Sequence, residues 1–164
     1  MVLQDYFTKW LEAVPIPDQR AETITKELIA IFSRMGIPQF LHSDQGRNFE
    51  STMLRNVLDA FGIKKTRTTA YHPQGDGMVE RANRSVLQML RTYVERKEEW
   101  ERWLPLLLYA YRTSVHASTG TTPFEVMFGR QQDSFLLPYK EQTYAGNPEQ
   151  YRDHLHRTLA ELHE

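Results

Sequence analysis

The segment between residues 21 and 69 constrains the fold most, because its apolar residues change period several times within one short stretch. Apolar residues at helical spacing alternate there with short runs that are rich in β-branched side chains. Gly36 and Gly62 follow the two helical runs, as glycine commonly does after a helix. Strands that alternate with helices predict an α/β fold. The predicted elements are a helix over 21–35, a strand over 39–43, a helix over 51–61 and a strand over 63–69.

The flanking sequence extends this alternation on both sides. Residues 2–7 and 10–16 predict two strands joined by a tight turn. Downstream, helices are predicted over 77–96 and 100–115, and the second is apolar nearly all round in its middle, which predicts a buried helix. The sequence TTPFE predicts a short helix that starts at Pro123 and ends at Gly129.

We therefore expect one domain over residues 1–129, a linker over 130–147 and a C-terminal helix over 148–164. A chain of 164 residues with 40% apolar side chains can form one domain with a core. The absence of cysteine excludes disulfides and cysteine-bearing zinc sites. No apolar run reaches the roughly 18–20 residues that a membrane span needs, so we expect no membrane partner.

The charge of the chain is uneven along its length. The net charge is −1, which argues against nucleic-acid binding by bulk attraction. Between residues 44 and 91, however, eight Lys and Arg stand against five acids, a local charge of +3. A basic segment suits a polyanionic substrate, and an ordinary mixed surface is the alternative.

Two acidic residues, Asp44 and Glu80, stand in informative surroundings with 35 residues between them. Asp44 lies in HSDQGRNF, where a predicted strand ends and a glycine turn follows. Glu80 lies in YHPQGDGMVERANR, where a loop rich in Pro and Gly leads into the first turn of a predicted helix. Accessible carboxylates of this kind suit a Mg²⁺ site for phosphodiester chemistry. The alternatives are a turn-forming or capping aspartate and a solvated glutamate favoured by the helix dipole.

The histidines offer weaker candidates. His72 lies in the loop before Glu80 and either contacts the substrate or has no role. His42 is interpreted as a packing residue. Three histidines of the acidic tail have spacings that suit zinc poorly, and they are His154, His156 and His163.

Four segments resemble a known family: DYFTKWLEAVPIP, HSDQGRNFES, GIKKTRTTAYHPQGDGMVERANR and LPLLLYAYRTSVHASTGTTPFEVMFGR. Together they resemble the integrase catalytic core of Gypsy/Ty3-type LTR retrotransposons, which are relatives of the retroviral integrases. The separation of 35 residues between the two acids is itself a mark of that family. The resemblance implies a ribonuclease H-like fold, with a mixed sheet flanked by helices, and a Mg²⁺ (or Mn²⁺) cofactor.

By position, the resemblance implies that Asp44 and Glu80 are catalytic and bind the metal. Gly75 stands where the family usually has serine. The residues expected to contact nucleic acid, some by position and some by their charge, are Arg67, Tyr71, His72, Gln74, Arg81, Asn83 and Arg84.

The first catalytic aspartate of the family lies on a strand upstream of the one that reads DYFTKW. The present sequence begins four residues before Asp5, so we expect that central strand and its aspartate to be missing. Asp5 is a weak candidate to replace the missing ligand, because it matches a position on the neighbouring strand. Without the central strand we expect two two-stranded pieces and a marginal fold, or a new pairing between the strand near Asp5 and the strand before Asp44.

Two functions of different classes follow. The first is DNA integration by 3′-end processing and strand transfer, impaired if the first aspartate is missing, so whether the chain is an enzyme stays open. The alternative is a catalytically inactive module from a domesticated or degenerate element, which binds DNA or pairs with integrase subunits through helix 100–116. We expect DNA as a partner, self-association through core helices, and a location in the nucleus or a cytoplasmic particle.

Overall fold

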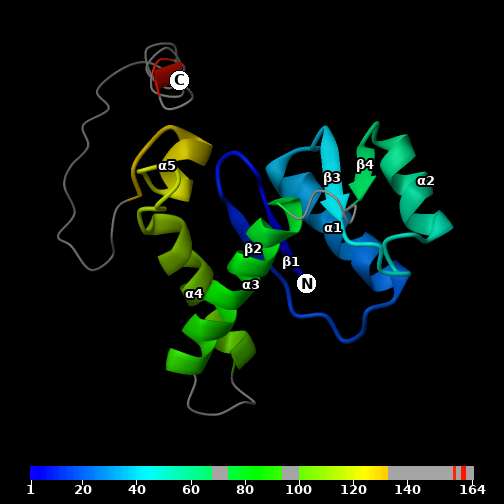
Figure 1. Cartoon of the computed structure of the whole chain (residues 1–164), viewed down its shortest axis with the longest axis horizontal. Helices are drawn as coiled ribbons and strands as arrows, with labels where there is room; N and C mark the ends of the chain where they lie inside the picture. Colours follow the sequence, from blue (N-terminus) through cyan, green and yellow to red (C-terminus); the bar gives the residue numbers. More distant parts are fainter. Residues whose placement is uncertain (68–73, 94–99, 133–156, 158–159, 162–164) are drawn as a thin grey trace. The chain divides into compact units, whose positions relative to one another are not determined.

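A computed structural model of the chain describes residues 1–67, 74–93, 100–132, 157 and 160–161. Among them the order of elements is β1, β2, α1, β3, α2, β4, α3, α4 and α5 (Figure 1). The contacts divide the chain into two compact units. Unit 1 holds Met1–Leu3 and Glu12–Leu104, and unit 2 holds Gln4–Leu11 and Pro105–Glu164. No described helix is both long enough and apolar enough to cross a membrane.

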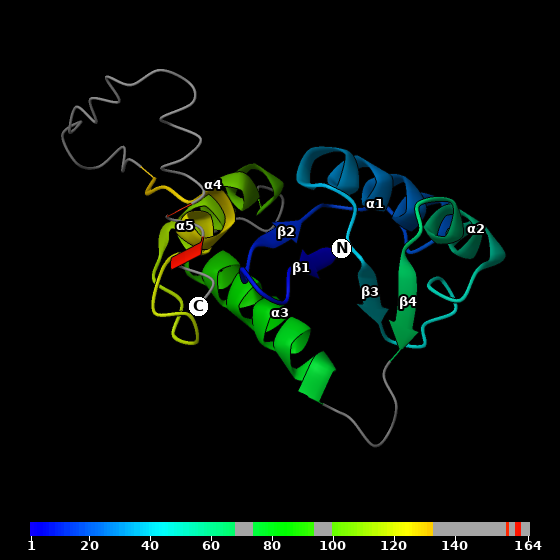
Figure 2. The same ribbon diagram turned by 90° about the horizontal axis from the view of Figure 1, so that it is seen from above.

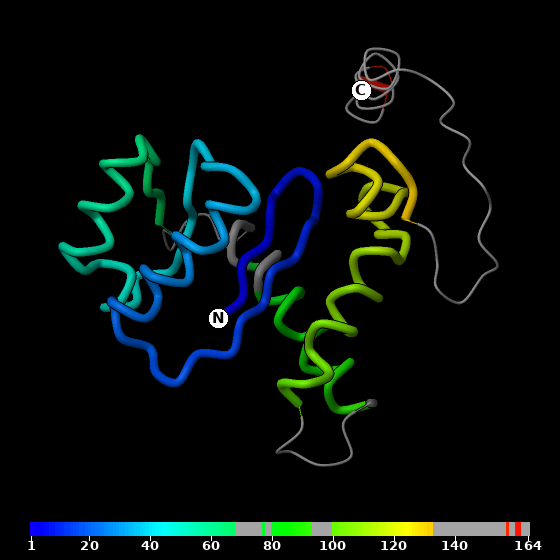
Figure 3. Tube along the Cα trace, turned by 180° about the vertical axis from the view of Figure 1, so that it is seen from behind, coloured from blue at the N-terminus to red at the C-terminus, as the bar shows by residue number. Residues whose placement is uncertain are grey.

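β1 (Val2–Gln4) and β2 (Leu11–Ala13) form a two-stranded hairpin (Figure 3). Between them, Asp5 Oδ1 accepts hydrogen bonds from the Thr8 backbone N–H at 2.7 Å and from the Thr8 hydroxyl at 2.6 Å. Lys9 completes the turn with a φ of 60°. Both predicted strands are confirmed, but they are shorter than predicted: the turn takes up residues 5–10 between them, and β2 ends at Ala13, three residues before its predicted end.

α1 (Ala21–Met35) has the bounds that the sequence predicts. Its apolar stripe is buried and consists of Ile24, Leu28, Ile31 and Phe32. Gly36 ends the helix with a φ of 94° and donates its N–H to the Phe32 carbonyl at 2.9 Å. A side chain at this position would strain the backbone, which explains why glycine follows the helix.

β3 (Phe40–Ser43), α2 (Thr52–Ala60) and β4 (Lys64–Arg67) form a parallel β-α-β unit, and the two arrows point the same way in Figure 2. The register places Phe40 opposite Lys64 and Ser43 opposite Arg67. This unit and α1 share one apolar core, which consists of Ile24, Leu28, Ile31, Phe32, Leu41, Leu54, Leu58 and Ile63. Packing in this core therefore holds β3 and β4 in place, and with them the residues at their ends.

α3 (Gln74–Tyr93) begins three residues before the predicted start at residue 77. Ala82 and Val86 are buried. Several residues on the other side of the helix are exposed, and they are Glu80, Asn83, Arg84, Leu87 and Arg91. The predicted start was wrong because Gly75 and Gly77 favoured a loop. A glycine inside a helix costs only about 1 kcal/mol relative to alanine, so it does not exclude a helix.

α4 (Trp100–Thr113) is not buried all round as predicted. Leu104, Leu107 and Leu108 are buried, whereas the Trp103 and Leu106 side chains are 39% and 44% exposed. A helix that packs along one stripe leaves its other sides in solvent, whatever their polarity. The apolar composition of the middle of α4 therefore did not predict which of its side chains are buried.

In unit 2, Arg112 of α4 binds the hairpin at the start of β2. Its guanidinium donates two hydrogen bonds to the Leu11 carbonyl, at 2.9 Å from Nε and 2.7 Å from Nη2. The same group lies 4.3 Å from the centre of the Trp10 ring. Trp10 also packs edge-on against Phe128 at 5.2 Å between ring centres. Trp10 is buried in this cluster, whereas Phe128 is 38% exposed.

α5 (Pro123–Phe128) confirms the predicted short helix. Thr122 caps it by accepting the Glu125 N–H at 3.1 Å, and Gly129 ends it with a φ of 63°. Most of the predicted linker over 130–147, and most of the helix over 148–164, lies outside the described residues. Positions 157, 160 and 161 are described, and they are helical.

In the described part of the chain the strands form two separate two-stranded sheets, β1-β2 and β3-β4. The expectation of two two-stranded pieces is confirmed. The alternative, a pairing between the strand near Asp5 and the strand before Asp44, is wrong, because β1 and β3 lie in separate sheets. Pairing within the hairpin closes a much shorter loop than pairing with β3 would, and so costs less chain entropy.

Candidate active site

Asp44 directly follows β3 and is exposed. Its Oδ1 accepts the Gly46 backbone N–H at 2.8 Å, which makes the turn that leads out of the strand. A Cβ on Gly46 would lie 2.8 Å from the same oxygen, so glycine is needed for this close approach. Asp44 therefore forms the turn, as one of the two interpretations of the sequence held. Its carboxylate stays exposed in this turn.

The loop that starts at Asp44 is closed by several hydrogen bonds. The Gly46 carbonyl accepts the N–H groups of Phe49 at 2.9 Å and Glu50 at 3.2 Å. Ser51 then caps α2 by accepting the Leu54 N–H at 3.2 Å. Asp44 is thus held between the end of a core strand and the start of a core helix.

Glu80 is the seventh residue of α3 and is exposed, so it does not lie in the first turn as predicted. Its Oε1 accepts a hydrogen bond from Arg84 Nη2 at 2.7 Å. Both side chains are about 70% exposed, at 69% and 72%. Residues four apart on a helix are neighbours, so the spacing alone signals this pair.

The candidate nucleic-acid ligands fall into two described groups. Arg81, Asn83 and Arg84 are exposed on α3 next to Glu80. Arg67 is exposed at the end of β4, and the register places it opposite Ser43, one residue before Asp44. The backbone of Gln74 starts α3. The remaining two candidates, Tyr71 and His72, lie outside the described residues.

His42 was interpreted as a packing residue, and this is wrong. Its side chain is exposed, and its Nδ1 lies 3.0 Å from the Thr66 hydroxyl on the neighbouring strand. Alternate residues of a strand share a face, and His42 lies on the outer face of β3 while Leu41 enters the core.

Glu50 and Lys65 form an ion pair that the sequence did not suggest. The Lys65 ammonium donates to the Glu50 carboxylate, and Arg55 lies 4.0 Å from the other carboxylate oxygen. This hydrogen bond, together with the charges of Lys65, Arg67 and Arg55, lowers the pKa of Glu50. Fifteen positions separate the pair, so only the β3-β4 register could reveal it.

The donor chemistry of Asp44 and Glu80 fits Mg²⁺, which prefers hard carboxylate oxygens and keeps several waters. Both carboxylates are accessible. Within the described ranges, no group of three or more His, Asp or Glu side chains is placed to hold a metal ion. Asp5 uses its Oδ1 to fix the hairpin turn, and its role as a substitute ligand stays a prediction.

Residues 1–73 match the family model "Integrase core domain". The chain is 39% identical to the Gag-Pol polyprotein of feline leukemia virus over 132 residues, which are 79% of this chain and 8% of that polyprotein. It therefore spans a small part of that relative.

Solved structures agree with this match. The catalytic core domain of BIV integrase is 30% identical, with a TM-score of 0.67 over 77% of this chain and 82% of that one. The HTLV-2 integrase catalytic core in complex with magnesium has the same fold, with a TM-score of 0.63 over 77% of this chain and 82% of that one, at 22% identity. The chain belongs to the retroviral-type integrase catalytic cores, and its fold class is ribonuclease H-like α/β.

Proposed function

We propose that this chain acts in DNA integration as a polynucleotidyl transferase core, with Asp44 and Glu80 as metal ligands. The observation that carries the proposal is the placement of Asp44. It is accessible at the end of a core strand, it is fixed by the Gly46 turn, and Arg67 lies at the end of the adjacent strand. Membership of the integrase core family supports the same function.

In the proposed reaction, the oxygen of a DNA 3′-hydroxyl attacks a target phosphorus in line, and the opposite P–O bond breaks. A bound Mg²⁺ would neutralise the charge that develops on the phosphate oxygens. Asp44 and Glu80 would hold the ion, while Arg67 and Arg84 would hold the DNA phosphates on either side. Such a role requires Arg84 to leave Glu80, and an exposed ion pair is weak enough for this exchange, at about 0–1 kcal/mol.

The test is a strand-joining assay of the full chain with labelled DNA ends and Mg²⁺. Asp44→Asn and Glu80→Gln each should reduce joining by at least about 100-fold, because each removes stabilisation worth several kcal/mol. Glu22→Gln, which removes an exposed carboxylate of α1, is the matched control and should keep full activity. Joining that survives both site variants would refute the proposal.

The second candidate is a DNA-binding module without catalysis. It is favoured by one observation, that the described residues gather no group of three potential metal ligands. In that case DNA affinity should fall steeply with salt but should not respond to EDTA or to Asp44→Asn. DNA is the proposed partner in both cases, and the nucleus or a cytoplasmic particle is the proposed location.

A further inference from the structure

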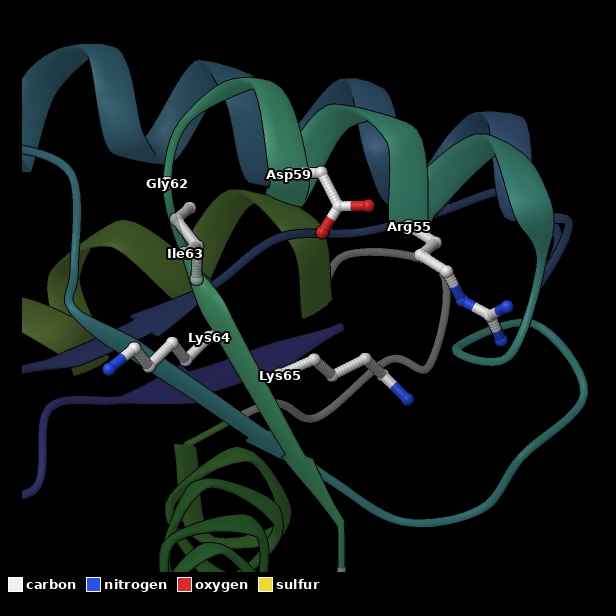
Figure 4. Close-up of a pocket in the computed structure, with 6 residues that line it drawn as sticks. All are labelled: Arg55, Asp59, Gly62, Ile63, Lys64 and Lys65. Carbon is white, nitrogen blue, oxygen red and sulfur yellow. The ribbon is translucent and has the colours of Figure 1, made fainter.

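Besides the exposed basic residues of α3, a basic surface lies at the β-α-β unit, on the side of β4 that α2 covers. We call it the α2–β4 surface and define it by Arg55, Glu50, Lys65 and Arg67. Next to it is a shallow hollow of about 530 Å³, which Arg55, Asp59, Gly62, Ile63, Lys64 and Lys65 line (Figure 4). In that view Arg55 and Lys65 extend toward the same side of β4, and Lys64 extends toward the other.

The charges of this region do not cancel. Three cations lie on this side, Arg55, Lys65 and Arg67, against two acids, Glu50 and Asp59, which leaves a local charge of +1 in a chain whose net charge is −1. Lys65 is 18% exposed and is committed to Glu50. Arg55 is 62% exposed and lies 4.0 Å from Glu50, a distance at the outer limit for an ion pair. The accessible positive charge is therefore that of Arg55 and Arg67.

The strand register connects this surface to the candidate active site. β4 runs parallel to β3, so Arg67 ends β4 at the same edge where Asp44 follows β3. Lys65 lies two residues earlier on the same face of the strand, about 6.6 Å away at the usual rise. Glu50 pairs with Lys65 and lies 4.0 Å from Arg55. Arg67, Lys65 and Arg55 therefore form a row of cations from the Asp44 edge of the sheet to α2.

We propose that the α2–β4 surface binds the sugar-phosphate backbone of DNA through Arg55 and Arg67, with Glu50 as an acid that limits the affinity. This inference rests on the proposed function, because DNA is its ligand. Arg55 and Arg67 are both exposed and lie on different elements, so a ligand with several negative charges can contact both, and the backbone of DNA is such a ligand. Arg55 is new as a DNA ligand, and the surface extends DNA contact away from Asp44 and α3.

The alternative is that the cations of β4 only protect an edge strand. Lysine and arginine on exposed strand edges discourage pairing with other chains. That role needs no DNA, and it does not involve Arg55, which lies on α2. Removal of Arg55 therefore separates the two interpretations.

The test measures the affinity of the full chain for a labelled DNA duplex by fluorescence anisotropy in EDTA, at 50–200 mM salt, the range used to count phosphate contacts. Each lost phosphate contact makes the slope of log affinity against log salt less negative by about 0.9. Arg55→Gln should change the slope by one such step, and the double variant Arg55→Gln/Arg67→Gln should change it by about two steps. Glu50→Gln should raise the affinity, since it releases Arg55 and Lys65.

The matched control removes two exposed cations of α1, with Lys26→Gln/Arg34→Gln. If Arg55→Gln changes the slope no more than this control does, the inference is overturned and edge protection explains the cations of β4. If Arg81→Gln/Arg84→Gln weakens binding while Arg55→Gln does not, only this inference fails. If the wild-type chain shows no salt-dependent DNA binding at all, the proposed function fails with it. Thermal melts of each variant show that the fold is kept.

Discussion

Near the candidate site, the structure shifts the pKa of the Glu50 carboxyl group. The hydrogen bond from Lys65 lowers the pKa of Glu50 below its usual 4.5, and the nearby guanidinium groups act in the same direction. The folded state therefore favours the charged carboxylate. A depressed acid pKa adds stability above the unfolded pKa, and this stability is lost as the pH falls through the lower folded pKa.

We therefore predict that Glu50→Gln melts at a lower temperature than the wild type at pH 7. The difference should shrink as the pH falls from 4.5 through the lower pKa of the folded state, where the folded wild-type carboxylate takes up its proton. Circular dichroism melts across this range measure the difference, with Glu22→Gln as the control. A difference that stays constant down to the lowest pH would show that the Lys65 contact contributes nothing through charge.

At the residue scale, sequence patterns found the side chains that depend on local spacing. HSDQG predicts the turn at Asp44, because both partners of that hydrogen bond lie within three positions. The Glu80–Arg84 pair was equally readable from its spacing of four. The Glu50–Lys65 pair and the exposure of His42 depend on the register between two strands, which no local pattern specifies.

Among the elements, α2 is the one whose start positions the loop of Asp44. Ser51 accepts the Leu54 N–H, so it satisfies one of the N–H groups that a helix start leaves without a partner. The helix in turn places Leu54 and Leu58 in the core.

We predict that Ser51→Ala lowers the free energy of unfolding by about 1 kcal/mol, the usual cost of a lost N-cap. Urea unfolding measures this change. Ser33→Ala is the control, since Ser33 lies on the exposed side of α1 and its hydroxyl only donates to the Ala30 carbonyl within the helix. An equal effect of both variants would mean that the cap contributes no more than an ordinary serine.

The elements that the sequence predicted best are those with explicit start and stop residues. α1 ends at a glycine with positive φ, and α5 begins with a threonine cap and a proline and ends at Gly129. The start of α3 and the burial of α4 were predicted wrongly. The glycines before Glu80 favoured a loop but did not exclude a helix, and average hydrophobicity does not specify which side of a helix is buried.

For the whole molecule, the two separate two-stranded sheets determine the expected stability. Two-stranded sheets are marginal on their own and need a packed face for support. The β3-β4 pair has such a face through Leu41. We therefore predict a broad thermal transition centred below about 50 °C, in the lower part of the mesophile range. Circular dichroism of the full chain measures it, and a sharp transition above that temperature would contradict the prediction.

The sequence predicted the α/β class, because alternating periods and turn residues are local signals. The two strand pairs were expected from the family resemblance and the missing central strand, with a new pairing of the strand near Asp5 as the alternative. That choice depends on loop entropy and on core packing across tens of residues, and the pairing of β3 with β4 required the structure.

The β-α-β unit over residues 40–67 also has a kinetic consequence. Four of its residues supply half of the shared core: Leu41, Leu54, Leu58 and Ile63. Its two strands pair in parallel across 24 positions, from Phe40 to Lys64, and the entropy of closing such a loop makes parallel pairing slow. We therefore expect this pairing to form late in folding, so that mutations at its contacts speed unfolding more than they slow refolding. The stretch that carries Asp44 and the α2–β4 surface would then be among the last parts of the chain to take its final form.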